Sequence, residues 1–146
     1  MTDSPIGEAL HQLLHAYKRA MQQSYQAHGI DFGIGHIRSL KVIRAHQASP
    51  ESPCTAQQIV ARLQRDKAQI ARLVKDLLAA ELIDRHDNPD DRRSQILRLT
   101  PAGEAMLRRI QDAEQHASLR LSRGLSQDDL HSFIRLAKSM TGNLKP

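Results

Sequence analysis

The feature of this sequence that most constrains its fold is a charged turn between two short strand-like segments. Residues 82–86 (LIDRH) and 94–99 (SQILRL) have the composition of strands, and residues 88–91 (NPDD) are typical of a turn. The pattern predicts a β-hairpin. Arg92 and Arg93 follow the turn directly. The charges therefore either only keep an exposed turn solvated, or the hairpin presents Arg92 and Arg93 to an anionic partner.

The rest of the chain has the periodicity of amphipathic helices. Apolar residues recur every three or four positions over 4–28, 34–46 and 101–123, and again after Ser126. Tryptophan is absent and aromatic residues make up only 3% of the chain, so aliphatic side chains must fill the core. A chain of 146 residues is long enough to form such a core.

Two shorter helices are expected immediately before the hairpin. Thr55 and Gln58 have the spacing of a capping box, which predicts that a helix begins there. Asp66, after the short connection QRD, can cap a second helix over 67–80. Two helices joined by a short turn and followed by a hairpin form a winged helix-turn-helix.

The predicted fold class is therefore mainly α with a small β wing, in which N- and C-terminal dimerisation helices flank the winged helix-turn-helix. We expect an N-terminal dimerisation helix over 1–30, a DNA-binding region over 31–100 and C-terminal dimerisation helices over 101–146, together forming one compact unit. The terminal helices carry apolar stripes that a single winged domain has little surface to cover. A homodimer is the expected solution.

The helix predicted over 67–80 has a polar face that is suited to DNA. Gln69 and Arg72 have the donor geometry to read adenine and guanine, Lys67 and Lys75 suit phosphates, and Ala68 permits close approach. The same residues are also compatible with an ordinary solvated helix face. The complete set of expected DNA contacts is Thr55, Arg65, Lys67, Ala68, Gln69, Arg72, Lys75, Asp90, Arg92 and Arg93.

The arginines after the turn are suited to the minor groove. An arginine gains from the negative potential of a narrow minor groove, and a neighbouring carboxylate can orient its guanidinium. In the alternative interpretation, Asp90 and Asp91 only form the turn, and Arg92 and Arg93 neutralise them.

These motifs resemble those of a known family. Residues 82–103 (LIDRHDNPDDRRSQILRLTPAG) closely resemble the wing signature of the MarR (multiple antibiotic resistance regulator) family, and residues 55–85 resemble its helix-turn-helix. The resemblance implies a homodimer with entwined first and last helices. It also implies that Arg92 is the minor-groove arginine, with Asp90 or Asp91 as its partner, and that Arg72 is the basic residue of the recognition helix. The family's frequent glycine before the first strand is absent, since the chain reads AAEL there.

The function expected from these features is sequence-specific regulation of transcription. The partners would be double-stranded DNA at a near-palindromic operator, a second copy of the chain, and a small-molecule effector that relieves repression. Two alternatives stay open: a metal- or redox-responsive regulator of the same fold, and a winged-helix interaction module that does not bind DNA. No nucleophile, metalloprotease or phosphate-loop motif is present, so neither an enzyme nor a cofactor is expected.

Charge and cysteine content fit this interpretation. The net charge is +5 and the isoelectric point about 9.8, which favours an anionic partner. A single cysteine, Cys54, and the lack of a signal or membrane-spanning segment predict a cytoplasmic protein without membrane association. His11 and His15, one helical turn apart, are candidates for metal ligands, and Cys54 is a candidate for a redox sensor.

Overall fold

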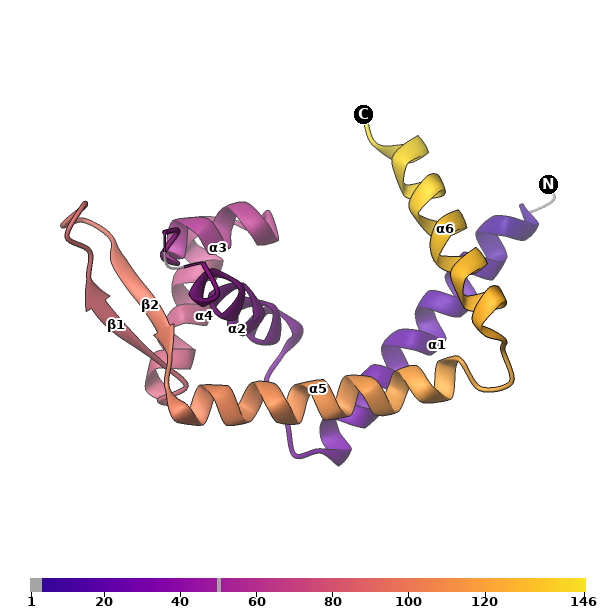
Figure 1. Cartoon of the computed structure of the whole chain (residues 1–146), viewed down its shortest axis with the longest axis horizontal. Helices are drawn as coiled ribbons and strands as arrows, with labels where there is room; N and C mark the ends of the chain where they lie inside the picture. The colour runs from indigo at the N-terminus through magenta and orange to yellow at the C-terminus, as the bar shows by residue number, and fades with distance from the viewer. Residues whose placement is uncertain (1–3, 50) are drawn as a thin grey trace. The chain divides into compact units, whose positions relative to one another are not determined.

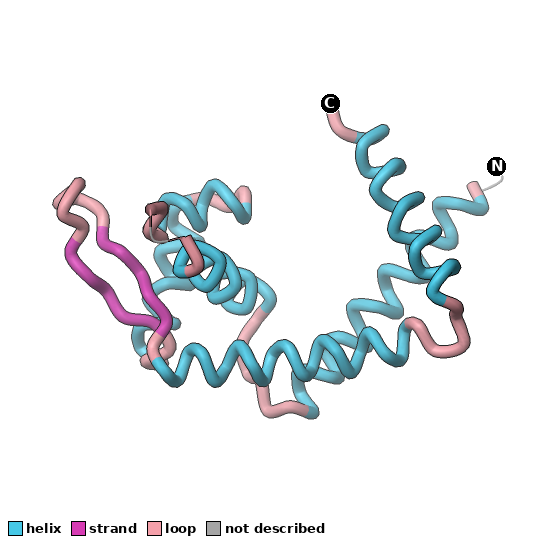
Figure 2. Tube along the Cα trace, viewed as in Figure 1, coloured by secondary structure: helices cyan, strands magenta, loops and turns pink. Residues whose placement is uncertain are grey.

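Six helices and one β-hairpin make up the computed structural model, which describes residues 4–49 and 51–146. In chain order the elements are α1 (Pro5–Ala27), α2 (Ile34–Gln47), α3 (Ala56–Leu63), α4 (Lys67–Ala79), β1 (Ile83–Asp87), β2 (Gln95–Leu99), α5 (Pro101–Leu121) and α6 (Gln127–Leu144) (Figures 1 and 2). The predicted class, mainly α with a small β wing, is confirmed.

The chain divides into two compact units. Tyr25–Ala113 form one of them, which we call the winged unit because it contains α2, α3, α4, the hairpin and the first part of α5. The other comprises the chain before Tyr25 and residues Glu114–Pro146, and we call it the terminal unit.

The core of the winged unit is built from the apolar faces that the periodicity predicted. α2 packs against α3, α4 and β2, and α4 also packs against α3 and β1. The largest side chains with almost no exposure come from these helices and from α5: Ile37, Leu40, Ile43, Ile59, Ile70, Leu77 and Ile110. Burying each such side chain contributes roughly 1.5–3 kcal/mol, so this layer supplies much of the unit's stability.

Short-range side-chain bonds set the helix starts. Asp66 Oδ1 accepts from the backbone N–H of Gln69 at 2.8 Å, which caps α4 as expected. The backbone N–H of Thr55 donates to Gln58 Oε1 at 3.2 Å at the start of α3. Ser126 and Asp129 exchange two bonds of 3.1 Å at the start of α6. These bonds depend on residues three positions apart, which is why the sequence predicted them.

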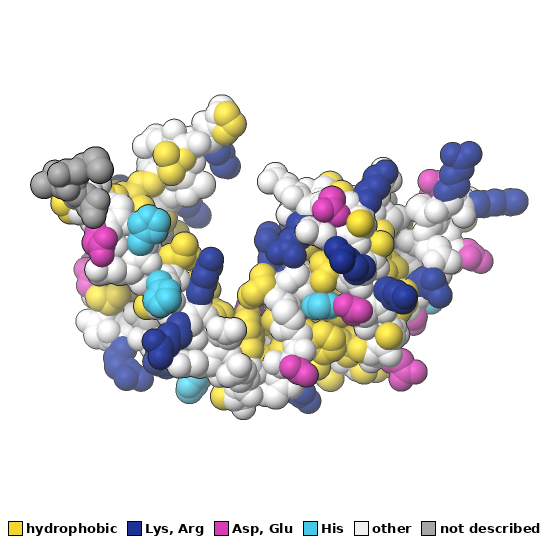
Figure 3. All heavy atoms as spheres, turned by 180° about the vertical axis from the view of Figure 1, so that it is seen from behind, with side chains coloured by type: hydrophobic (Ala, Val, Ile, Leu, Met, Phe, Trp, Pro, Cys, Tyr) yellow, Lys and Arg dark blue, Asp and Glu magenta, His cyan; other side chains and the backbone are white. Residues whose placement is uncertain are grey.

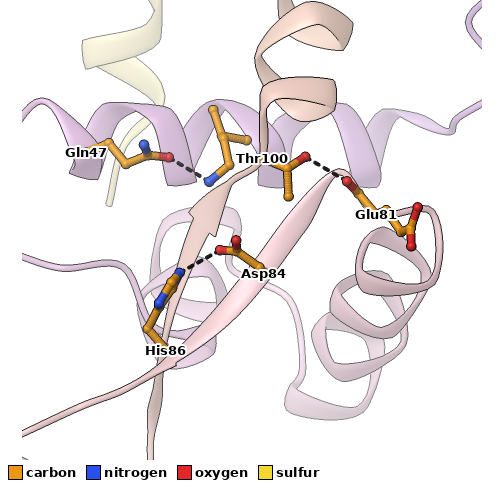
Figure 4. Close-up of polar contacts among 6 residues, drawn as sticks. Gln47, Glu81, Asp84, His86 and Thr100 are labelled. Atoms are coloured by element: carbon orange, nitrogen blue, oxygen red, sulfur yellow. Dashed lines mark hydrogen bonds and ion pairs between the residues drawn. The ribbon is translucent and has the colours of Figure 1, made fainter.

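The hairpin is tied to the helices along one edge. β1 and β2 pair antiparallel from Ile83 with Leu99 to Asp87 with Gln95. On the other edge of β2, the N–H of Leu97 donates to the carbonyl oxygen of Cys54 at 2.8 Å. The N–H of Leu99 donates to the side-chain oxygen of Gln47, also at 2.8 Å (Figure 4). The end of α2 and the loop after it therefore hold the base of the hairpin.

The entry into the hairpin uses a strained backbone position. Glu81 has a φ of +59°, in the left-handed region that favours glycine, at the place where the resembled family often has glycine. Its carbonyl oxygen accepts from the Thr100 hydroxyl at 2.6 Å, which joins the two ends of the hairpin (Figure 4). The geometry is thus kept without the glycine.

Gly103, in the LTPAG stretch, can lie directly against the backbone of Leu82 because it has no side chain. A Cβ built on Gly103 would overlap the carbonyl oxygen of Leu82. Its backbone N–H also donates to the side-chain oxygen of Thr100 at 3.0 Å, which caps the start of α5. The glycine of LTPAG therefore allows the first turn of α5 to pack on the start of the hairpin.

The apolar stripes of the terminal helices are exposed within the single chain. On α1 the stripe consists of Ile6, Leu10, Leu13, Leu14 and Tyr17. No residue of α6 is buried, and its Phe133, Ile134 and Met140 are all exposed. Leu121, one of the apolar residues that recur along α5, is exposed as well. The periodicity of 101–123 would place Leu121 on the buried side of its helix, and that expectation is wrong because an apolar stripe does not require burial within the chain itself.

Candidate nucleic-acid interface

The predicted recognition helix, α4, presents its polar face to solvent. Ile70, Val74 and Leu77 are buried, whereas the predicted contact residues on the opposite side are all exposed: Lys67, Ala68, Gln69, Arg72 and Lys75. The structure thus brings every α4 residue of the predicted set onto one accessible face. That face holds three cations and one amide, a combination that can contact phosphates and base edges.

A hydrogen bond between helices fixes the last turn of α4. His36 Nε2 lies 2.9 Å from Asp76 Oδ2, and this contact links α4 to the first turn of α2. Phe32 also packs against the His36 ring, with 5.6 Å between the ring centroids. Asp76, the acid at the edge of the basic face, is therefore engaged with a second helix.

Two predicted contacts before α4 are less accessible than the rest. Thr55 and Arg65 are both half-buried. A Cβ built on Gly35 would lie 2.8 Å from Nη1 of Arg65, so this guanidinium lies over the first turn of α2. Arg65 therefore stands beside the exposed face of α4 with part of its side chain packed against α2.

The end of the hairpin holds its arginines through a compact set of turn bonds. The backbone N–H of Asp90 donates to Asn88 Oδ1 at 3.0 Å, and that of Arg93 donates to Asp91 Oδ1 at 2.9 Å. Arg92 and Arg93 are both exposed. In Figure 3, Lys and Arg side chains are prominent on the winged unit, including the outer end of the hairpin.

The two acids do not pair with the arginine side chains. No ion pair joins Asp90 or Asp91 to Arg92 or Arg93 in the part of the chain that the structure describes. Asp91 instead has the role of a turn former, which was the second of the two interpretations. Orientation of a guanidinium by Asp90 remains a prediction.

Cys54 is a buried structural residue. Its exposed fraction is 1%, and loss of solvation raises the pKa of the thiol from 9.0 to about 12. The thiol therefore stays protonated near neutral pH, and a protonated thiol is a poor nucleophile. This environment does not favour the redox alternative.

The metal alternative gains no support from geometry. His11 and His15 are exposed on α1, and among residues 4–49 and 51–146 no three His, Cys, Asp or Glu side chains gather as a metal site would require.

Of the helices described, none is both long and apolar enough to cross a membrane.

One basic cluster was missed by the sequence analysis. Arg38 and Lys41 of α2 line a common hollow with Arg62 of α3, which lies about twenty residues further along the chain. A visible signal was that neither helix contains an acidic residue.

The fold and the exposed basic surface together define a winged helix-turn-helix protein. Residues 37–94 match the model of the MarR family. A search of the curated proteins finds no match.

Solved structures share the fold over nearly the whole chain. A mutant of MarR from E. coli, complexed with operator DNA, superposes with a TM-score of 0.74 at 20% identity, covering 93% of each chain. A mutant of MepR from S. aureus superposes with a TM-score of 0.79 at 20% identity, covering 95% of this chain and 98% of that chain. BpsR from Bordetella bronchiseptica, whose DNA binding is regulated by 6-hydroxynicotinic acid, gives 0.75 at 18% identity, covering 97% and 96%.

The family model matches the helix-turn-helix and the first part of the hairpin, so this region of the chain is similar to the MarR family. The residues that carried the resemblance, from α3 to the end of the hairpin, lie largely inside the matched segment.

Proposed function

We propose that this chain is a sequence-specific DNA-binding regulator of transcription that acts as a homodimeric repressor. The observation that carries the proposal is the exposure, within one compact unit, of the polar face of α4 and of Arg92 and Arg93 at the end of the hairpin. In this proposal α4 enters the major groove and the hairpin arginines enter the adjacent minor groove.

The predicted contact residues divide by role in this proposal. Gln69 and Arg72 read bases, while Lys67 and Lys75 neutralise phosphates and set the register of the protein on the duplex. Support comes from the relatives, since the E. coli MarR structure contains operator DNA. No enzymatic activity and no cofactor form part of the proposal.

The homodimer is supported by the exposed stripes of the terminal helices. Isolated apolar residues on a surface are normal, but a continuous stripe on a soluble protein marks an interaction site. In the proposed assembly, helices of 1–30 and 101–146 pair with those of a second copy, and 31–100 bind DNA. Two α4 helices related by a twofold axis would contact successive major grooves about 34 Å apart, so the operator should be a near-palindrome.

Relief of repression by a small molecule is the final part of the proposal. Its support is the relation to BpsR, for which a small heterocyclic acid regulates DNA binding. A ligand that binds one arrangement of the two DNA-binding regions better than another would shift the dimer away from the operator.

The proposal is tested by measuring the binding of the purified protein to the duplex upstream of its own coding region. Fluorescence anisotropy over a salt series should show affinity that falls steeply as salt rises, because phosphate contacts release counterions. Arg92→Ala combined with Arg93→Ala should weaken specific binding by about 1–3 kcal/mol, or roughly 5- to 150-fold.

Lys18→Ala combined with Arg19→Ala is the matched control, since these residues are another adjacent exposed pair, located on α1. The control should bind DNA like the unmodified protein. Weak, salt-insensitive association of the unmodified protein would contradict the proposal and favour an interaction module that does not bind DNA.

A further inference from the structure

The positive charge of this chain is concentrated on its central helices. Residues 34–80 contain eight Lys and Arg against three Asp and Glu, an excess of five that equals the net charge of the whole chain. Four of these eight bases are in the predicted DNA-contact set. The other four lie on α2 and α3, which contain no acidic residue: Arg38, Lys41, Arg44 and Arg62.

Three cations from two helices converge on one hollow. Arg38 and Lys41, three residues apart on α2, and Arg62, in the last turn of α3, line a hollow of about 200 Å³. Val42 and Leu63 also line it, and both are buried. The packing of α2 on α3 therefore holds the three cations around a largely apolar base.

This arrangement favours an anion. Guanidinium groups offer several N–H donors in a planar fork that matches the oxygens of phosphate, and an ammonium adds a compact positive charge. The apolar base limits water on one side of the hollow, which strengthens the attraction of an anion within it.

We propose that Arg38, Lys41 and Arg62 form a binding site for phosphate oxygens, separate from the predicted contacts on α4 and the hairpin. Two sources can supply this chemistry: a free phosphorylated small molecule, or a backbone phosphate of the bound duplex. The second source rests on the proposed function, whereas the first does not.

The test uses the full-length protein with Arg38→Gln and Lys41→Gln combined. Arg135→Gln with Lys138→Gln is the matched control, because this pair is also an exposed arginine and lysine three residues apart, on α6, and it removes the same net charge. Thermal unfolding of both variants checks that each is folded.

The first measurement is a titration with pyrophosphate, in which binding is monitored by calorimetry or by amide NMR shifts. Pyrophosphate should bind the unmodified protein and the control equally, and the site variant at least tenfold more weakly. This measurement requires no DNA binding, so its result stands if the proposed function fails.

The second measurement is the salt dependence of duplex affinity. Each phosphate contact contributes about 0.9 to the slope of log K against log salt, so the site variant should reduce the magnitude of the slope by about 0.9 if the duplex supplies the phosphate. An unchanged slope with weakened pyrophosphate binding identifies a free phosphorylated molecule as the source. If the site variant matches the control in both measurements, the proposed site is overturned.

Discussion

The recognition helix α4 and the last helix α6 have the same kind of apolar periodicity, but only α4 has its apolar face buried within the single chain. α4 buries Ile70, Val74 and Leu77 against α2, α3 and β1, whereas α6 buries no residue. The same contrast separates the winged unit, which has its own core, from the terminal unit, in which apolar residues of α1 and α6 are exposed.

This contrast shows what an apolar stripe specifies. The stripe determines which face of a helix is buried, but it does not determine whether the surface that buries it belongs to the same chain. In the winged unit the covering surface is intramolecular. In the terminal unit, under the proposed function, a second copy supplies it.

The largest expected effect is on the terminal unit. Leu14→Glu places a carboxylate in the exposed stripe of α1, and in a homodimer it would bury two uncompensated charges. We expect dimerisation to weaken by about 4 kcal/mol, roughly a thousandfold, as measured by sedimentation equilibrium.

Gln22→Glu adds the same charge to the opposite, polar side of α1 and is the control for this change. It should leave the dimer intact. If the Leu14 variant remains as dimeric as the control, the stripe of α1 is not the interface and the comparison between the two units fails.

The next effect is on the winged unit. Gly103→Ala forces a methyl group against the carbonyl oxygen of Leu82 and should destabilise the protein by about 2–3 kcal/mol in urea unfolding. Gly7→Ala, in the open face of α1, provides the contrast, since the nearest atom to its added Cβ would be 3.8 Å away. In that variant the free energy of unfolding should rise by roughly 0.5–1 kcal/mol. Equal effects at both positions would show that Gly103 is not sterically required.

The smallest effect is a gain of stability at the entry to the hairpin. Glu81→Gly removes the left-handed strain at φ +59°, partly offset by the greater entropy of the unfolded chain, so a net gain of about 0.5–1 kcal/mol is expected. Glu81→Ala shortens the side chain but keeps the Cβ and should show no such gain. A loss of stability in the glycine variant would mean that the Glu81 side chain has a stabilising role.

The sequence predicted the parts of the fold that depend on neighbouring residues. The cap of α4 by Asp66, the start of α5 after Thr100 and the antiparallel hairpin each depend on residues close in the chain. The exposed face of α4 followed from the same periodicity. These features were predictable because local spacing alone determines them.

The contacts that escaped prediction join residues far apart in the chain. His36 with Asp76, and Gln47 with the backbone of Leu99, pair across 40 and 52 positions. The convergence of Arg38, Lys41 and Arg62 depends on how α2 packs on α3. No local pattern encodes such pairings, although the lack of acids on both helices was an available signal.

The most direct test of the central claim, that α4 and the hairpin bind neighbouring grooves of one duplex, is a pair of footprints on the same operator. Methylation protection reports on the major groove and hydroxyl-radical protection on the minor groove. We predict adjacent protection in both, with Arg92→Ala and Arg93→Ala together abolishing only the minor-groove protection, and Arg72→Ala abolishing only contacts in the major groove. If the hairpin variant leaves the minor-groove footprint unchanged, the claim is contradicted.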